Sequence, residues 1–272
     1  MPIDVERLRH DARQRARLRP RPAFAGVIGD LTHGGVRMRR YVPDVREPEC
    51  GVVFLHAGYG LFGDLDMQDP YCRVLADTLS VEVLSVDYRL APEATLDDAA
   101  TDALTGLRLL ADEGVTRLFL CGDSAGGTVS TLAAQRSTLP LAGLMLTNPS
   151  LDLTLRSFDR TLPGGPDPEL SAWSFRAWTR VVDLGDAPRL DRDAGLLPRT
   201  VVAVGTLDSL APDARALAEA CRRAGVDCRL VELEGAEHGF VGTDRVGEAL
   251  TPFRELIHGP VDTSGQPRGL AR

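Results

Sequence analysis

A serine enclosed by glycines is the residue of this chain best suited to nucleophilic chemistry. Ser124 is the centre of the sequence Gly-Asp-Ser-Ala-Gly at 122–126, between an apolar, strand-like run at 118–121 and a helix-compatible segment at 128–135. This order is typical of a nucleophile elbow, a tight turn that lifts the serine hydroxyl above the edge of a sheet. Gly122 and Gly126 remove side chains that would collide with the neighbouring backbone. We therefore predict that Ser124 is a nucleophile.

A serine hydroxyl is a poor nucleophile at neutral pH and needs a base within hydrogen-bonding distance. Of the five histidines, only His56 and His238 closely follow strand-like segments. His238 comes after the run at 230–233, on a loop that lies at the carboxyl end of its strand. We predict that His238 is the base.

The base needs a carboxylate that orients it. Asp208 follows the strand-like run at 201–205. Ser124, Asp208 and His238 then occur in the chain order that is typical of α/β-hydrolases, each after its own strand. Asp213 is a reserve acid, although we expect it to start the next helix.

The negative oxygen of a tetrahedral intermediate needs hydrogen-bond donors. One is the backbone N–H of Ala125, directly after the nucleophile. Others are expected from the loop His-Ala-Gly-Tyr-Gly at 56–60, because the predicted strand at 52–55 runs into it.

Composition narrows the function further. The chain has 272 residues, 43% of them hydrophobic, and a net charge of −8, which makes nucleic-acid binding an unlikely main task. It has no apolar stretch long enough to span a membrane and no apolar signal core near its start. The five cysteines lack metal-ligand spacing, and a reducing, cytoplasmic location fits them.

The segment at the start is an exception to the acidic balance. Three acids, Asp4, Glu6 and Asp11, oppose a larger set of arginines there. We interpret the segment as a solvated basic helix that packs over the domain, with contact to an anionic partner or substrate as the alternative. The arginines are Arg7, Arg9, Arg13, Arg15, Arg17, Arg19 and Arg21.

The rest of the chain alternates strand-like and helix-like segments, which predicts an α/β fold with a mostly parallel sheet and helices on both faces. The alternation breaks at 150–196, which holds both tryptophans and which we interpret as a cap or pocket wall. Catalytic groups are expected at the carboxyl ends of the strands. Expected strands are 27–33, 36–42 (a hairpin with the first), 52–55, 81–86, 118–121, 141–146, 200–204 and 228–233; expected helices are 69–79, 96–110, 128–135, 213–224 and 242–257.

Four segments together resemble the bacterial hormone-sensitive-lipase-like carboxylesterases of the α/β-hydrolase fold. They are the elbow at 122–127, Asp-Tyr-Arg-Leu-Ala-Pro-Glu at 87–93, Gly-Thr-Leu-Asp-Ser-Leu at 205–210 and His-Gly-Phe at 238–240. The resemblance implies an α/β-hydrolase domain at 27–258 and a basic N-terminal cap segment at 1–26, and the Gly/Pro-rich composition of 259–272 predicts a flexible tail there. The resemblance also implies that the segment at 87–93 is structural.

The oxyanion loop departs from the family pattern His-Gly-Gly-Gly. The resemblance assigns the oxyanion hole to the N–H groups of Gly58, Tyr59 and Ala125, and it gives His56 a bracing role. A tyrosine resists positive φ, and its ring adds bulk beside the pocket. Three roles are open for this side chain: the ring alters specificity or the chemistry, the hydroxyl acts as a donor or holds the substrate, or the ring folds back against the insertion.

We therefore expect a serine hydrolase that cleaves small to medium carboxylic esters through an acyl-enzyme. It needs no metal or organic cofactor, and its partners are a small-molecule ester and, given the edge strands of such folds, a second copy in a homodimer. Acyl transfer or cyclisation by the same acyl-enzyme is one alternative. A ligand-binding protein without catalysis is another, less favoured because all three triad residue types are present.

Overall fold

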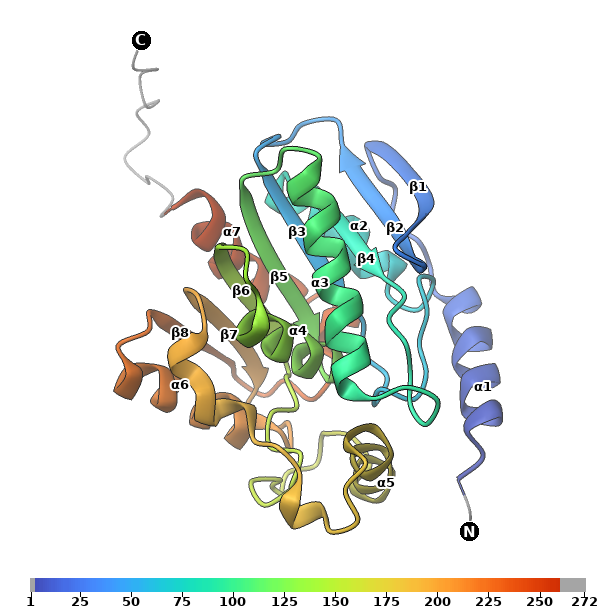
Figure 1. Cartoon of the computed structure of the whole chain (residues 1–272), viewed down its shortest axis with the longest axis vertical. Coiled ribbons are helices and arrows are strands. Elements are labelled where there is room, and N and C mark those ends of the chain that lie inside the picture. Colours follow the sequence, from blue (N-terminus) through green and yellow to red (C-terminus); the bar gives the residue numbers. More distant parts are fainter. Residues whose placement is uncertain (1–2, 260–272) are drawn as a thin grey trace.

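The computed structural model describes residues 3–259, and a single eight-stranded sheet organises them (Figure 1). The strand order is β1-β2-β4-β3-β5-β6-β7-β8. β2 runs antiparallel to β1 and to β4, and the other neighbours are parallel. The strands are β1 (Gly26–His33), β2 (Val36–Pro43), β3 (Cys50–Leu55), β4 (Glu82–Val86), β5 (Arg117–Asp123), β6 (Leu141–Thr147), β7 (Thr200–Gly205) and β8 (Cys228–Leu233).

Helices cover both faces of the sheet because its central strands are apolar on both faces. On β3, Val53 and Leu55 pack in the core with α3, α4 and α6, whereas Val52 and Phe54 pack with α2 and α7. This division follows from the two-residue alternation of side chains along a strand. The helices are α1 (Val5–Leu18), α2 (Asp69–Leu79), α3 (Leu96–Asp112), α4 (Ala125–Arg136), α5 (Pro168–Thr179), α6 (Ala211–Ala224) and α7 (Val246–His258).

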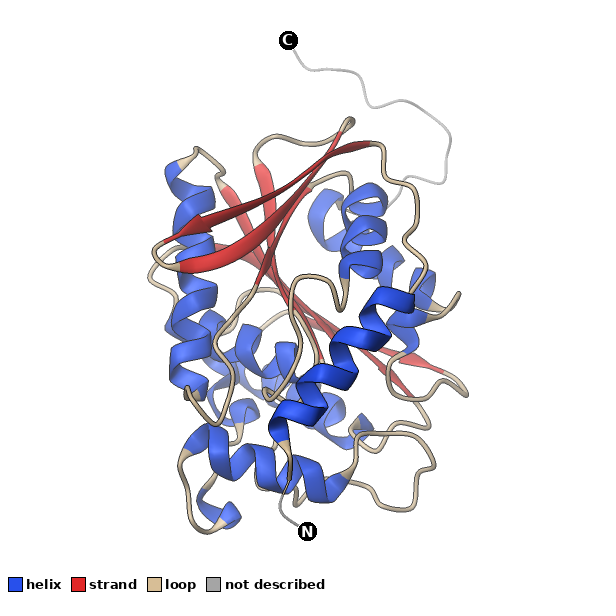
Figure 2. Cartoon of the chain, turned by 90° about the vertical axis from the view of Figure 1, so that its right-hand side faces the viewer, coloured by secondary structure: helices blue, strands red, loops and turns tan. Residues whose placement is uncertain are grey.

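The basic opening segment forms α1, which lies along the outside of the molecule (Figure 2). The Asp4 side chain caps the helix by accepting from the Arg7 N–H. Two small residues of the helix, Ala12 and Ala16, are its buried positions. Arg9 anchors the helix by donating to the carbonyl of Leu61 at 2.9 Å. The expectation that this segment packs over the domain is therefore confirmed.

The insertion at 150–196 contains α5 and two 3₁₀ segments, η1 (Leu184–Asp186) and η2 (Leu190–Leu196). In Figure 1, α5 lies beyond the ends of β5 and β7, on the side of the sheet where these strands terminate. Its N-terminus is capped by Asp167, whose side chain accepts from the Leu170 N–H. The insertion thus lies over the edge of the sheet at which the sequence predicts the catalytic residues.

The expected fold class and alternation are confirmed, but three helices start elsewhere than predicted: α4 begins at Ala125 instead of 128 and α6 at Ala211 instead of 213, and the start of α7 differs most. We predicted a helix from 242, but α7 begins at Val246, after a 3₁₀ turn η3 (Phe240–Gly242) that follows Gly239 at φ 79°. The expected tail lies outside the described residues apart from Gly259. Among residues 3–259, no helix combines the length and apolarity that crossing a membrane requires.

Candidate active site

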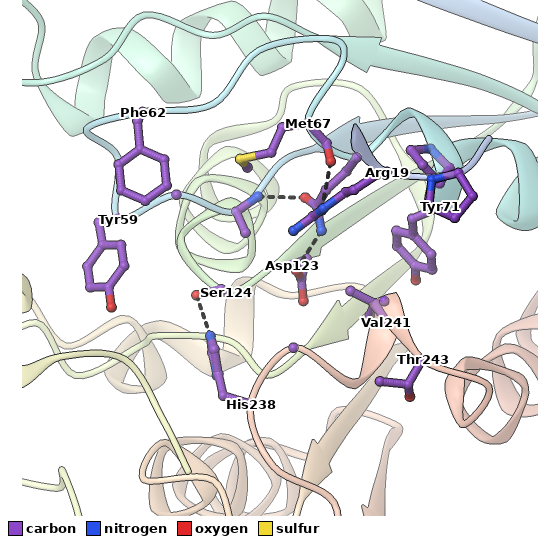
Figure 3. A pocket seen from close by; sticks show the side chains of 17 residues that line it. Arg19, Tyr59, Phe62, Met67, Tyr71, Asp123, Ser124, His238, Val241 and Thr243 are labelled. Carbon is purple, nitrogen blue, oxygen red and sulfur yellow. Dashed lines mark hydrogen bonds between the residues drawn. The ribbon is translucent and has the colours of Figure 1, made fainter. Parts of the chain in front are cut away.

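The structure brings the three predicted catalytic side chains together at the carboxyl edge of the sheet. Ser124 follows β5, Asp208 follows β7 and His238 follows β8. His238 Nε2 lies 3.0 Å from Ser124 Oγ, and its Nδ1 lies 2.7 Å from Asp208 Oδ2. Figure 3 shows His238 pointing at the Ser124 hydroxyl inside the pocket. One imidazole therefore links a hydroxyl and a carboxylate, as a proton relay requires.

The turn at Ser124 has the strained geometry of a nucleophile elbow. Ser124 adopts φ 54° and ψ −116° as the residue before α4. A Cβ atom on Gly122 would lie 2.2 Å from the carbonyl oxygen of Gly126, and one on Gly126 would lie 2.0 Å from that of Leu55. Both glycines are thus required by close backbone approach, as the sequence predicts.

The environment of His238 favours its protonated form. Burial by itself lowers the pKa of His238, but the hydrogen bond that His238 donates to Asp208, the charge of Asp208 and the charge of Asp123 outweigh it. The net result is a pKa raised above the ordinary value of 6.5. A raised pKa makes the imidazole a better proton acceptor for Ser124 and stabilises the imidazolium that forms.

The reserve acid takes no part in this constellation. The carboxylate of Asp213 accepts the N–H groups of Leu151 and Asp152 at 2.8 and 2.9 Å, and the hydroxyl of Ser157. Burial raises the pKa of Asp213 to about 6. It lies in the first turn of α6, which begins two residues earlier than predicted, and it ties the start of the insertion to that helix.

Three backbone N–H groups around Ser124 have no partner within residues 3–259. They belong to Gly58, Tyr59 and Ala125, the residues predicted for the oxyanion hole. Gly58 and Tyr59 line the pocket that contains Ser124, and Ala125 is the first residue of α4. Free donors beside a nucleophile are the groups that a developing oxyanion needs. The assignment of the oxyanion hole to these three N–H groups therefore remains our prediction.

A chain of buried side chains holds the oxyanion loop against the elbow. Gln68 Oε1 accepts the N–H of Ala57 at 2.7 Å, and Gln68 Nε2 donates to Asp123 Oδ2 at 2.7 Å. The hydroxyl of Thr147 donates to the other Asp123 oxygen at 2.7 Å. Sequence reasoning missed Gln68 and Thr147. The one signal that could have indicated such partners was Asp123, because a carboxylate directly before the nucleophile needs hydrogen-bond donors when it is buried.

Tyr59 adopts the left-handed conformation that a tyrosine disfavours, at φ 60°. The cap holds it there. Its phenolic oxygen accepts the N–H of Asp167 at 2.8 Å, and its carbonyl accepts the hydroxyl of Ser174 on α5. Next to it, Gly60 packs so closely on Trp178 that a Cβ atom would lie 2.7 Å from the indole. The Tyr59 ring is thus folded back against the insertion, which is one of the roles expected from the sequence.

His56 acts as a brace and does not join the relay. It is buried, burial lowers its pKa to about 4, and its Nδ1 lies 2.7 Å from the carbonyl of Ala57. The ring stacks on Tyr88 at a centroid distance of 4.3 Å, and the Tyr88 hydroxyl donates to the His56 carbonyl. A neutral imidazole that donates within the loop fits the bracing role implied by the resemblance.

The segment at 87–93 ties neighbouring parts of the chain together. Arg89 donates to the buried carboxylate of Asp102 on α3 at 2.8 Å. Glu93 accepts from Arg9 on α1 at 2.6 Å. These contacts give the segment a structural function, because none of its three charged residues, Asp87, Arg89 and Glu93, lines the pocket of Ser124.

The pocket around Ser124 has a volume of about 490 Å³. Its walls come from the start of the chain, the oxyanion loop, α2 and the segment after His238. One candidate metal-binding group exists among the described residues, Glu47, Glu49 and Cys50, but it lies at the opposite, amino end of β3. The apolar part of the pocket lining is Pro20, Phe62, Met67, Pro70, Tyr71 and Val241.

Comparison with known proteins agrees with this geometry. A family model described as the α/β-hydrolase fold matches residues 52–242. Esterase LipI of Mycobacterium tuberculosis is 32% identical over 248 residues, which cover 80% of this chain and 76% of the relative. The chain belongs to this α/β-hydrolase family. Its predicted kinship with hormone-sensitive-lipase-like esterases is thereby confirmed.

Solved structures of this family share the fold over nearly the whole chain. A hormone-sensitive lipase from a metagenome library superposes with a TM-score of 0.82 and 25% identity, covering 94% of this chain and 91% of that one. The esterase EstE5 superposes with a TM-score of 0.84 at 21% identity, over 94% of this chain and 91% of that one. The shared fold therefore extends over 94% of this chain.

Proposed function

We propose that this protein, a carboxylic ester hydrolase, cleaves its substrates through an acyl-enzyme formed on Ser124. His238 takes the proton of the Ser124 hydroxyl as the oxygen attacks the acyl carbon, and it then gives that proton to the departing alcohol. Asp208 fixes the tautomer of His238 and stabilises its charged form. Water, activated by His238, releases the acid and regenerates the serine.

The observation that carries this proposal is the double hydrogen bond of His238. Its two nitrogens lie 3.0 Å from Ser124 Oγ and 2.7 Å from Asp208 Oδ2, so proton transfer needs no rearrangement of the chain. The relative LipI is named an esterase, which supports the ester as the substrate class. The pocket volume of about 490 Å³ suits esters of small to medium size.

The oxyanion that forms on the acyl carbon would be held by the N–H groups of Gly58, Tyr59 and Ala125. Each lacks a partner among residues 3–259, so none has to give up a hydrogen bond in order to serve. Losing one such donor typically costs about 10²- to 10³-fold in rate.

A fluorophosphonate probe tests the nucleophile directly. We expect covalent labelling of the wild type, no labelling of Ser124→Ala, and hydrolysis of 4-nitrophenyl butyrate by the wild type only. Absence of labelling in folded wild-type protein would favour a ligand-binding role. Transfer of the butyryl group to added amines or alcohols in preference to water would favour acyl transfer, which product analysis detects.

A further inference from the structure

A cationic side chain from the start of the chain reaches the pocket. Arg19 follows the last residue of α1, its backbone N–H donates to the carbonyl of Ala16, and its side chain lines the pocket together with Ser124 and His238. Figure 3 shows the Arg19 guanidinium directed into the pocket between Met67 and Asp123. Its Nη1 donates to the carbonyl oxygen of Met67 at 2.9 Å, which fixes the group at the wall.

Among residues 3–259 no carboxylate pairs with Arg19; the same holds for Arg13, Arg15 and Arg17, but of these four only Arg19 lines the pocket. A guanidinium carries five N–H donors, and within residues 3–259 Arg19 uses a single one, on a neutral carbonyl. Three other arginines are paired with acids: Arg9 with Glu93 at 2.6 Å, Arg21 with Asp66 at 3.2 Å and Arg39 with Asp30 at 2.6 Å.

The carboxyl groups of the site are not available to Arg19. Asp123 is the one acidic residue in the pocket lining, and both of its oxygens already accept hydrogen bonds, from Gln68 and Thr147. Burial also raises the pKa of Asp123, which weakens its charge as a counter-ion. Asp208 is fully buried and bound to His238.

The segment that carries Arg19 is basic in an otherwise acidic chain. Residues 4–21 carry seven arginines and three acids, a net charge of +4, whereas the whole chain has −8. The remaining residues therefore sum to −12, by subtraction of +4 from −8. A local positive field of this kind raises the local concentration of anions at the pocket.

We propose that Arg19 binds an anionic group, a carboxylate above all, that the ester substrate carries at a distance from the scissile bond. This inference rests on the proposed function, because it assigns a substrate class to the site of Ser124. A carboxylate suits a planar guanidinium fork, which it can engage with two parallel hydrogen bonds. The apolar wall formed by Pro20, Phe62 and Met67 would contact the carbon chain between the ester and the anion.

Matched ester pairs test the proposal on both sides of the scissile bond. On the acyl side, 4-nitrophenyl hydrogen adipate carries a terminal carboxylate and 4-nitrophenyl hexanoate does not. On the alcohol side, 4-carboxyphenyl butyrate is compared with its neutral isostere 4-carbamoylphenyl butyrate. We expect the wild type to favour the anionic member of one pair through a lower KM, with similar kcat.

Arg19→Gln should remove about fivefold of that preference, the size expected for an exposed charge pair, through a rise in KM that is larger for the anionic ester than for its neutral partner. Arg19→Lys should restore part of it, because the point charge remains but the fork is lost. Arg17→Gln is the matched control: it removes the same charge two residues earlier, outside the pocket lining, and should change the ratio much less.

Two results would overturn the proposal. One is an anionic-to-neutral ratio that Arg19→Gln leaves unchanged in both pairs. The other is an equal loss in Arg17→Gln, which would show that the general field of the basic segment, and not the contact at Arg19, selects the substrate. Failure of the proposed function would look different, since Ser124→Ala would then leave hydrolysis of the neutral esters unaffected.

Discussion

The two halves of the active site are supported in different ways. Ser124, Asp208 and His238 follow β5, β7 and β8 directly, so the register of the buried sheet sets their positions. The oxyanion loop at 56–60 also follows a strand, but its conformation depends on distant side chains: Gln68 before α2 and Ser174 on α5. The sheet therefore sets the arrangement of the three side chains, whereas the conformation of the proposed oxyanion hole depends in part on the insertion.

The largest expected effect comes from breaking the sheet-supported half. Asp208→Asn keeps the shape of the side chain but offers His238 the wrong tautomer, so we expect kcat for 4-nitrophenyl butyrate to fall by about 10⁴-fold. Asp213→Asn is the matched control, since that buried acid is bound to the insertion and to no group of the relay. It should lower thermal stability and leave kcat nearly unchanged. A similar loss of kcat in both variants would contradict the assignment.

Breaking the tether between the two halves should have an intermediate effect. Gln68→Ala removes the acceptor of the Ala57 N–H and a donor to Asp123. We expect kcat to fall by roughly 10- to 100-fold with little change in KM, because the loop would lose its alignment in the transition state more than in the ground state. Gln68→Glu keeps the acceptor for the Ala57 N–H. When the introduced carboxyl group and Asp123 share one proton, the donor to Asp123 is also replaced, so part of the rate should return at pH values where that proton is bound. A loss confined to KM would instead indicate a role in substrate binding.

Loosening the cap-supported half should cost less. Ser174→Ala removes the hydroxyl that donates to the Tyr59 carbonyl, and we expect kcat to fall by about threefold to tenfold, since one neutral hydrogen bond is lost. Ser171→Ala is the control, because the Ser171 hydroxyl donates to the Asp167 carbonyl within the same helix and does not contact the loop. Ser174→Thr should recover activity if the hydroxyl is what matters. Equal effects of the two alanine variants would show that the helix, and not this contact, sets the rate.

The pH profile gives the smallest but most specific signal. Catalysis requires neutral His238, and its pKa is raised, so the acidic limb of kcat/KM should lie above pH 6.5. In Asp208→Asn the charge that raises the pKa is gone while burial still lowers it, so the residual activity should extend to lower pH. A limb that stays in place in this variant would mean that another group titrates.

The sequence predicts the sheet-supported half well because its signals are local. Apolar runs with a two-residue or continuous pattern indicate the strands, and residues at the carboxyl ends of parallel strands must meet at one edge. Ser124 and His238 are 114 positions apart, yet each could be placed from the strand that precedes it. The same reasoning gave the antiparallel hairpin of β1 and β2, because two glycines join its alternating runs.

The cap-supported half could not be predicted because its contacts join residues without a shared pattern. Nothing in the sequence near Ser174 indicates that its hydroxyl meets Tyr59, which is 115 positions away. The positive φ of Tyr59 runs against its local preference and exists because the fold around it compensates. The predicted start of α7 was wrong for a related reason. Gly239 adopts a left-handed conformation and the 3₁₀ turn η3 follows it, so the α-helix begins later than the sequence pattern indicates.

The position of the two tryptophans gives this protein a built-in optical reporter. Trp173 and Trp178 both lie on α5, and the indole of Trp178 is fully buried against Gly60 of the oxyanion loop. The chain has no other tryptophan, so its tryptophan emission, excited selectively over that of the four tyrosines, arises from α5 alone. Fluorescence lifetime and quenching by acrylamide can therefore follow movements of α5 during turnover without any attached dye.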